Sequence, residues 1–350
     1  MLPEGARVGF RPCSYDPKVF SPRIRAVLPA QYLAGAGVDA RVVPESGQGR
    51  FDCVVFQKAY AKADFQLAET LKARGARLLF DLCDNHFWNP AGDPAVAERV
   101  QRLERMIDLV DAVTVSSTEI AQLITAKPTY QADDALELLP FTKGAERLGR
   151  LTRPLRERRR KGKGRVRLVW HGQSGTENIG SGLTPVGKLV PELERLHART
   201  PLSLTIMSNS PKAYRQHIAT ARFPTRFVKW RSRTFTTLFA QHDICILPIE
   251  HNAFTVCKTN NRAMTSLLLG VPVIADEIPS YREFKDWMFF GDWANHITQY
   301  AKGPRLATHH VQSAQRHIAA TYTPQRVVDQ WRRALDAVFA SRPAHDPGRA

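Results

Sequence analysis

Short apolar segments alternate along this chain with longer segments whose apolar positions recur every three or four residues. The short segments predict strands that are buried on both faces, and the longer ones predict amphipathic helices that cover them. The elements predicted in the first half are strand Arg7–Phe10, helix Ile24–Ala34, strands Ala40–Val43 and Asp52–Gln57, helix Phe65–Arg74, strand Arg77–Leu82, helix Ala95–Val110, strand Ala112–Ser116 and helix Thr118–Thr125. This alternation indicates a parallel sheet between two helical layers.

The second half repeats the same alternation. Its predicted elements are strand Arg167–Trp170, helix Val186–His197, strands Ser203–Met207 and Arg226–Lys229, helix Phe235–Gln241, strand Ile244–Pro248, helix Lys258–Leu269 and strand Val271–Ala275. Two such halves predict two Rossmann-like domains with a cleft between them. Ligands of open α/β sheets bind beyond the carboxyl ends of the strands, so functional residues are sought there.

The domain boundaries follow from these patterns. We expect an N-terminal Rossmann-like domain over residues 1–142, a linker over 143–165, a second Rossmann-like domain over 166–322 and a C-terminal helix over 323–340. Thr323 before Pro324 is a typical helix start, because threonine caps the helix and proline suits its first turn. This last helix could cross back to the N-terminal domain and tether the two domains, or simply cover the edge of one sheet.

The composition is that of a soluble globular protein, with 43% apolar and 24% charged residues among 350. No apolar run approaches the length of about 18 residues that spans a bilayer. The first residues lack the basic and then apolar pattern of a secretory signal. The five cysteines stand singly without CxxC spacing, which argues against a disulfide framework and a zinc site. A cytoplasmic location is therefore expected.

Much of the net charge of +17 is concentrated in the predicted linker. Residues 143–165 hold eleven lysines and arginines against two glutamates, so this segment alone contributes +9. It could be a solvated connector extended by its own repulsion. It could also contact an anionic membrane leaflet, at about 1 kcal/mol per basic residue, or the phosphates of nucleic acid. The sequence leaves these alternatives open.

A candidate phosphate site lies at the start of the predicted helix Lys258–Leu269. Thr259 is a suitable N-cap, and the first turn of a helix offers free backbone N–H groups and the positive end of the helix dipole. Lys258 and Arg262 are four residues apart and are expected to point to the same side. Such a helix start suits a phosphate or diphosphate, although it is also compatible with an ordinary capped helix that bears two exposed cations.

The second half resembles the nucleotide-sugar-binding domain of GT-B glycosyltransferases, in the retaining group of glycosyltransferase family 4, group 1. The resemblance rests on the order and spacing, over about 120 residues, of the segments Leu168–Gly175, Phe227–Trp230, Asp243–Pro248 and Lys258–Ala275. The first half matches only in fold, with the loop at residues 21–25 after its first strand. This family carries two glutamates separated by seven residues, and Cys257 and Thr265 stand at those positions here.

The resemblance implies an α/β protein of the GT-B fold, with two doubly wound parallel-sheet domains facing across a cleft. It implies that residues 1–142 form the acceptor-side domain and residues 166–322 the donor domain. It implies a nucleotide-diphosphate sugar as donor substrate. The residues expected to bind the donor diphosphate are Lys258, Arg262, Asn261, Gly172, Gly175, Arg23 and Arg25. The residues expected to contact the donor sugar or nucleoside are Asn252, Phe254, Thr255, Glu277 and Trp230. Each could instead be an ordinary surface, loop or capping residue.

Candidate catalytic groups follow the predicted strand Arg77–Leu82. Asp81, Asp84 and His86 offer two carboxylates and an imidazole that could accept a proton from an acceptor hydroxyl. Alternatively, Asp84 caps the next helix and His86 is partly buried. The fold that the chain resembles works without a metal, so we expect neither a metal nor another cofactor.

The sequence therefore predicts a metal-independent glycosyltransferase that uses a nucleotide-diphosphate sugar. The acceptor is expected to be a glycan, or a lipid-linked glycan reached at the membrane surface through the basic linker. Two alternatives remain: a GT-B enzyme that glycosylates nucleic acid such as DNA, and a non-catalytic GT-B-like binding module, which the missing glutamates would permit. An epimerase acting on sugar nucleotides fits less well, because it needs several carboxylates in the cleft.

Overall fold

The computed structural model describes residues 1–137, 164–175 and 180–341. They form two compact units, one of residues 1–137 with the chain from Tyr322 onward, and one within Leu138–Thr321. The predicted linker 143–165 lies outside the described residues except for its last two positions. Each unit is described by itself. No helix of the described part combines the length and hydropathy that crossing a bilayer requires.

The first unit contains a six-stranded parallel sheet in the order β2-β1-β3-β4-β5-β6. Its strands are β1 Arg7–Pro12, β2 Asp39–Val42, β3 Cys53–Gln57, β4 Arg77–Leu82, β5 Ala112–Val115 and β6 Thr129–Gln131. The strand order reverses between β1 and β3, so the loops after these two strands diverge. A crevice at such a switch point is where doubly wound sheets bind ligands.

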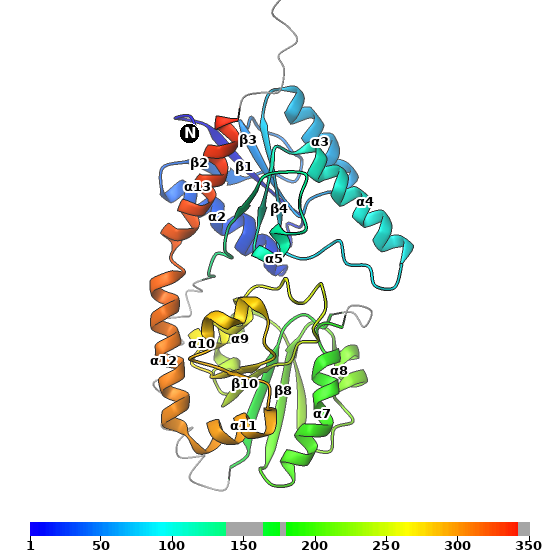
Figure 1. Cartoon of the computed structure of the whole chain (residues 1–350), viewed down its shortest axis with the longest axis vertical. Helices are drawn as coiled ribbons and strands as arrows, with labels where there is room; N and C mark the ends of the chain where they lie inside the picture. The colour runs from blue at the N-terminus through cyan, green and yellow to red at the C-terminus, as the bar shows by residue number, and fades with distance from the viewer. Residues whose placement is uncertain (138–163, 176–179, 342–350) are drawn as a thin grey trace, which may run out of the picture. The chain divides into compact units, whose positions relative to one another are not determined.

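Helices cover both faces of this first sheet (Figure 1). They are α1 Phe20–Pro22, the π-helical turn η1 Arg23–Val27, α2 Leu28–Gly35, α3 Lys62–Ala73, α4 Pro94–Leu109, α5 Thr118–Ala121 and α13 Pro324–Ala340. Helix α13 packs with α2 on one face, where the buried Trp331 ring meets Phe10 at a centroid distance of 5.1 Å. As predicted, the Thr323 side chain caps α13 and accepts a hydrogen bond from the Arg326 amide.

The second unit contains a second six-stranded parallel sheet, in the order β12-β11-β10-β7-β8-β9. Its strands are β7 Val166–His171, β8 Leu202–Ser208, β9 Thr225–Lys229, β10 Ile244–Leu247, β11 Val273–Ala275 and β12 Phe289–Phe290. Counted along the chain, this is the 3-2-1-4-5-6 order of dinucleotide-binding domains, with its switch point between β7 and β10.

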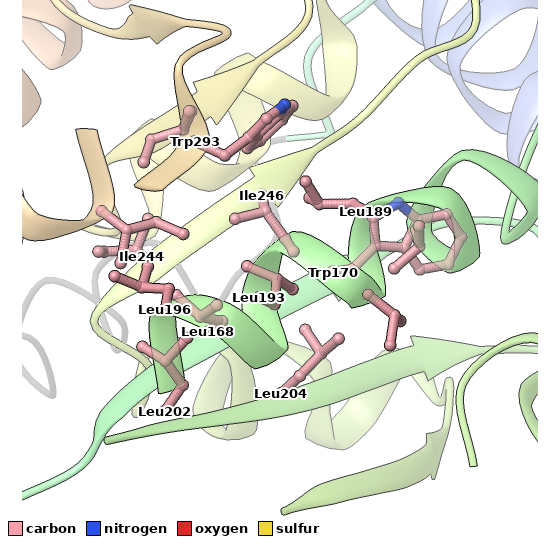
Figure 2. Close-up of a cluster of buried hydrophobic side chains, with 14 of the residues drawn as sticks. Leu168, Trp170, Leu189, Leu193, Leu196, Leu202, Leu204, Ile244, Ile246 and Trp293 are labelled. Carbon is pink, nitrogen blue, oxygen red and sulfur yellow. The ribbon is translucent and has the colours of Figure 1, made fainter. Parts of the chain in front are cut away.

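The helices of the second unit are α7 Thr184–His197, α8 Pro211–His217, α9 Ser232–Phe239, α10 Asn261–Leu268, the 3-10 helix η3 Pro279–Phe284, α11 Trp293–Lys302 and α12 Pro304–Thr321. One face of the sheet is packed by leucines of α7 and by Trp293 of α11, and Trp170 of β7 lies fully buried among them (Figure 2). This core holds the carboxyl end of β7 rigidly in place.

The predicted strands and helices recur with small shifts at their ends, but two details of the prediction are wrong. Helix α10 starts at Asn261 rather than at Lys258, and the N-cap position belongs to Asn260 rather than Thr259. Lys258 and Thr259 belong to the loop before the helix, so the argument that Lys258 and Arg262 share one helical face no longer applies. The short strands β6 and β12, the 3-10 helix η3 and the helices α8, α11 and α12 were not predicted.

Candidate functional site

The loop after β7 lies at the switch point of the second sheet. The Ser208 hydroxyl donates a hydrogen bond of 2.8 Å to the Gly172 carbonyl, and the Ser174 amide donates one of 2.8 Å to Asn209 Oδ1. Gly182 has a φ of +73°, and a Cβ placed there would overlap the Ser174 carbonyl. Only glycine allows the backbone segments to pack this closely. The described part of this loop next to β7, Gly172–Gly175, is here called the glycine loop.

Arg262 reaches this loop from the first turn of α10. Its guanidinium lies over the Trp170 ring, 5.5 Å from the ring centroid, and donates a long hydrogen bond of 3.4 Å to the His171 carbonyl. A Cβ on Gly172 would come within 2.9 Å of Arg262 Nη1, so the glycine leaves room for the guanidinium. Across the described residues, no carboxylate forms an ion pair with Arg262, which leaves this half-buried cation available for an anion.

The groups around Arg262 stay uncharged at neutral pH. Burial, reinforced by the positive charge of Arg262, lowers the pKa of His171 to about 3. Neutral His171 then makes a 3.1 Å hydrogen bond from Nε2 to the Ser266 hydroxyl. Burial raises the pKa of Tyr281, with the neighbouring Arg262 opposing the rise, so this phenol also stays neutral. Arg262 is thus surrounded by neutral groups that position it without cancelling its charge.

The other predicted diphosphate ligands are placed differently from Arg262. Lys258 Nζ lies 4.0 Å from the centroid of the Phe254 ring, in the loop before α10. Asn261 is buried in the first turn of α10, where its Oδ1 lies 3.5 Å from the Thr265 hydroxyl. Gly172 and Gly175 form the glycine loop described above, as predicted from the sequence.

The predicted sugar-contacting loop is stabilised by its own side chains. Asn252 Oδ1 accepts hydrogen bonds of 3.0 Å from the amides of Phe254 and Thr255. The buried Thr255 hydroxyl donates to the Glu250 carbonyl. Both polar side chains therefore help to form the turn itself, while the Phe254 ring packs with Lys258 as described.

The two remaining nucleoside candidates follow other strands of the second sheet. Glu277 comes just after β11 and forms an exposed ion pair of 2.6 Å with Arg282. Trp230 directly follows β9, where its amide donates to the Ser208 carbonyl at 2.8 Å and its ring lies near Phe235. Trp230 is therefore anchored through its backbone to the same serine that supports the glycine loop.

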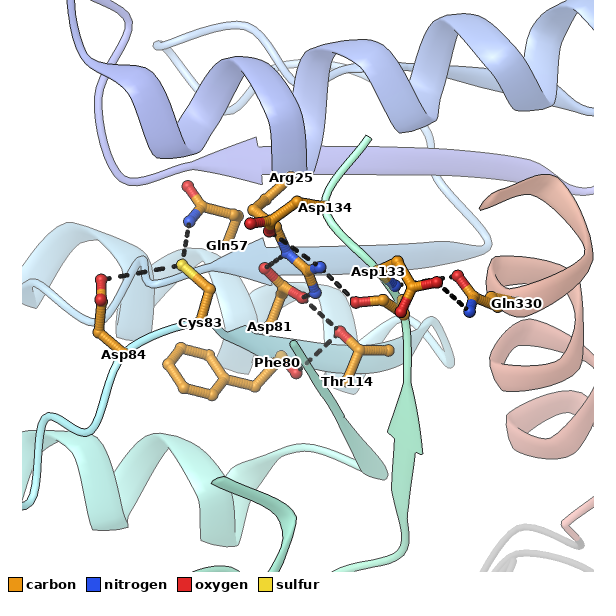
Figure 3. A network of polar contacts seen from close by, with 11 residues as sticks. Arg25, Gln57, Phe80, Asp81, Cys83, Asp84, Thr114, Asp133, Asp134 and Gln330 are labelled. Atoms are coloured by element: carbon orange, nitrogen blue, oxygen red, sulfur yellow. Dashed lines mark hydrogen bonds and ion pairs between the residues drawn. The ribbon is translucent and has the colours of Figure 1, made fainter. Parts of the chain in front are cut away.

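Two residues predicted to act in the site form a buried ion pair in the first unit instead. The Arg25 and Asp81 side chains are fully buried, with Arg25 Nε 3.1 Å from Asp81 Oδ2 and a second contact from Nη2 to Oδ1. Thr114 donates to the same carboxylate at 2.8 Å, and Asp134 lies on the other side of Arg25 (Figure 3). Because both side chains are buried, Arg25 cannot contact a diphosphate in this structure, and Asp81 cannot contact an acceptor hydroxyl.

Arg25 lies in a π-helical turn. Residues Arg23–Val27 are wound more widely than an α-helix, and Arg25 is one of the buried residues of this turn. Arg23, in the same turn, forms a two-pronged ion pair with Glu137, at 2.8 and 3.0 Å. Its charge is thus largely neutralised within the first unit. Arg25 is therefore not placed as the sequence led us to expect, whereas the predicted role of Arg23 stays a prediction.

Asp84 and His86 lie beyond the carboxyl end of β4, and each has a partner that the sequence analysis missed. Lys58 Nζ forms an ion pair of 2.8 Å with Asp84 Oδ2, and both side chains are mostly buried. The Tyr60 hydroxyl lies 2.7 Å from His86 Nδ1. Lys58 and Tyr60 follow β3, at the switch point of the first sheet. Polar residues directly after a buried strand were the signal that could have identified them.

The environment keeps these groups in definite charge states. Burial works against the charge of Lys58, but Cys83 and Asp84 beside it raise its pKa above the ordinary value. Burial raises the pKa of Cys83 to about 12, so this thiol is protonated. Burial also raises the pKa of Tyr60, which therefore keeps its phenolic proton at neutral pH. Lys58 adopts a left-handed φ of 48°, an uncommon conformation for a residue other than glycine.

Comparison with known proteins gives a match in fold but not in sequence. No family model matches the chain, and no curated protein matches it. Among solved structures, a mutant of TarM from S. aureus, in complex with fondaparinux, α-GlcNAc-glycerol and UDP, superimposes with a TM-score of 0.55 at 10% identity, covering 82% of this chain and 55% of TarM. This chain thus spans about half the length of TarM.

Two further structures match over more of their own length. A UDP-forming α,α-trehalose-phosphate synthase from Burkholderia vietnamiensis has a TM-score of 0.56 at 11% identity, covering 89% of this chain and 76% of the synthase. The N-terminal domain of trehalose-6-phosphate phosphatase from Candida albicans has a TM-score of 0.61 at 9% identity, covering 97% of this chain and 98% of that domain.

These likenesses confirm the predicted fold. The neighbours include GT-B glycosyltransferases, and the two parallel six-stranded sheets with flanking helices agree with that fold class. At identities near 10% the likeness shows the fold alone. One fold hosts many activities, so the activity must be argued from the residues of the site.

Proposed function

We propose that this protein is a glycosyltransferase that takes its sugar from a nucleotide-diphosphate sugar. The observation that carries the proposal is Arg262, a half-buried cation with no carboxylate partner in the described chain, set against the glycine loop after β7. This place is the switch point of a sheet with dinucleotide-binding order. A diphosphate is the ligand that best fits such a combination of fixed cation, open loop and helix start.

The same geometry suits the chemistry of sugar transfer. As the bond between the sugar and the diphosphate breaks, negative charge accumulates on the leaving diphosphate. A fixed guanidinium and backbone N–H groups stabilise such developing charge. We therefore propose that Arg262, with Lys258 and Asn261 near the start of α10, acts where other transferases use a metal ion. The UDP of the TarM complex and the UDP-forming synthase support a nucleotide donor.

The acceptor is proposed to be a glycan or a lipid-linked glycan. Asp84 and His86 are the groups proposed to handle the acceptor hydroxyl. The Tyr60 hydroxyl, 2.7 Å from His86 Nδ1, and Lys58 Nζ, 2.8 Å from Asp84 Oδ2, would hold these two groups in place. The proposed membrane contact through residues 143–165 concerns a segment outside the described residues and remains a prediction.

Isothermal titration with UDP, GDP, ADP and CDP tests the donor site. The wild type should bind at least one of them. Arg262→Ala should weaken this binding about 10- to 100-fold, since a hydrogen bond to a charged group contributes about 1.5–3 kcal/mol. The matched control is Arg199→Ala, an exposed arginine after the C-terminal end of α7. Absence of binding by the wild type, or equal affinity of the two variants, would remove the proposal.

A non-catalytic binding module is the second candidate. Cys257 is a buried thiol whose Sγ contacts the Ala253 carbonyl, so the position of a family glutamate is filled by a structural side chain. The full-length likeness to an N-terminal domain of a phosphatase also fits a module with another role. This candidate predicts nucleotide binding without any hydrolysis or transfer from sugar nucleotides. The nucleic-acid alternative depends on residues 143–165 and stays untested.

A further inference from the structure

The short helix η3, Pro279–Phe284, contacts the proposed donor site at three points. The Ser280 hydroxyl donates a hydrogen bond of 2.7 Å to the Lys258 carbonyl. The Tyr281 hydroxyl lies beside the Arg262 guanidinium. The Glu283 carboxylate accepts a hydrogen bond of 3.1 Å from Asn260 Nδ2. Three side chains within four consecutive residues thus hold the loop, the N-cap residue and the cation of α10.

These contacts matter because α10 is poorly secured by its own sequence. It is only eight residues long, and its N-cap residue Asn260 makes no capping hydrogen bond with its side chain. A helix this short depends on tertiary contacts for its stability. The Asn260 side-chain amide donates to Glu283 instead. A tertiary contact from η3 therefore restrains the start of α10 in place of a local cap.

Glu283 also connects this restraint to α12. Its second oxygen, Oε1, lies 2.6 Å from Nε2 of His317, and the His317 ring packs against Trp287 at a centroid distance of 4.9 Å. One carboxylate therefore joins Asn260 to a long helix whose buried side chains anchor it in the second unit. The start of α10 is fixed relative to α12 and not only to its own sheet.

Tyr281 acts directly on the orientation of Arg262. It is 1% exposed and neutral, so its oxygen can accept a hydrogen bond from the guanidinium without cancelling the positive charge. The guanidinium lies over the Trp170 ring and donates to the His171 carbonyl, and the Tyr281 hydroxyl is its polar neighbour. A cation held in this way loses less side-chain entropy when an anion binds, which improves affinity without a new contact.

We propose that η3 is a positioning element of the donor site, in which Tyr281 orients Arg262 while Ser280 and Glu283 fix the chain at the start of α10. None of these residues needs to touch the ligand. This inference rests on the proposed function, because it assigns η3 the task of preparing Arg262 for a diphosphate.

A double-mutant cycle tests the inference, with isothermal titration of the nucleoside diphosphate that the wild type binds. Tyr281→Phe keeps the buried ring and removes only the hydroxyl. It should weaken binding about tenfold in the wild-type background, yet have almost no effect in the Arg262→Ala background, since contacting residues are not additive. Thermal unfolding of all four proteins checks that each is folded.

Glu283 gives an independent comparison. Glu283→Gln keeps an oxygen that can accept from Asn260, whereas Glu283→Ala does not. The alanine variant should bind the nucleotide several-fold more weakly than the glutamine variant. A Tyr281→Phe effect of equal size in both backgrounds would overturn the inference, as would wild-type affinity in Tyr281→Phe. Failure of the proposed function would look different, because the wild type itself would then bind no nucleotide or Arg262→Ala would change nothing.

Discussion

Breaking the buried Arg25–Asp81 pair should destabilise the first unit strongly. Arg25→Met removes the guanidinium that lies 3.1 Å from Asp81 and leaves a fully buried carboxylate without its cation. Removing one partner of a buried ion pair costs about 3–5 kcal/mol. A domain is stable by only about 5–15 kcal/mol, so this variant should lie near the limit of folding.

Urea unfolding by circular dichroism, with hydrogen exchange of the β1 and β4 amides to localise the effect, measures this loss. The double variant Arg25→Met/Asp81→Leu should recover most of the stability, because it removes the unpaired charge as well. The matched control is Arg7→Ala, which breaks an ion pair of 3.0 Å to Asp52 whose side chains are 37% and 40% exposed. That variant should lose no more than about 1 kcal/mol.

One result would refute the structural role of Arg25. In it, the free energy of unfolding of Arg25→Met lies within about 1 kcal/mol of the wild-type value, yet the variant no longer binds the nucleotide. Arg25 would then serve the ligand, as the sequence first suggested, and the buried pair would not be what determines its position.

Three further predictions concern the two sheets. Because burial lowers the pKa of His171 to about 3, the unfolded state binds the extra proton, and stability should fall as pH drops from about 6.5 toward 3. His171→Leu should flatten this slope by up to about 1.4 kcal/mol per pH unit in urea titrations between pH 6 and 4; an unchanged slope would contradict the assignment. Gly182→Ala should lower the thermal unfolding midpoint far more than Gly270→Ala. Both glycines have a positive φ, but only a Cβ at Gly182 would overlap backbone atoms, so equal decreases in the midpoint would contradict this. Lys58→Met should lower the rate of sugar transfer about tenfold or more while leaving nucleotide affinity unchanged, because it removes the partner of Asp84 in the other unit; weaker nucleotide binding would argue against that division of roles.

The alternating hydrophobic pattern was sufficient to predict both sheets, because strands buried on both faces leave a clear apolar signal. Strand β4 was predicted at Arg77–Leu82 with both ends correct. The cap of α13 was also predicted correctly, at Thr323. The strand β12, of two residues, and the strand β6, of three, are too short to carry such a pattern. Their places depend on pairing with neighbouring strands.

The site was harder to predict, because its geometry depends on contacts between distant residues. Arg25 and Asp81 are 56 positions apart, so nothing in the local sequence shows that they neutralise each other. The start of α10 was misplaced because the capping preference of Thr259 was outweighed by tertiary contacts from η3, which hold Lys258 and Asn260. Gly172 and Arg262, by contrast, lie close together, since the loop after β7 and the start of α10 flank the switch point of one sheet.

The central claim is that Arg262 and the glycine loop after β7 bind the diphosphate of a nucleotide. A crystal structure of the protein with a bound nucleoside diphosphate tests it most directly. The account predicts phosphate oxygens within hydrogen-bonding distance of the Arg262 guanidinium, next to the backbone at Gly172–Gly175. A nucleotide bound elsewhere, or one whose phosphates point away from Arg262, would contradict it.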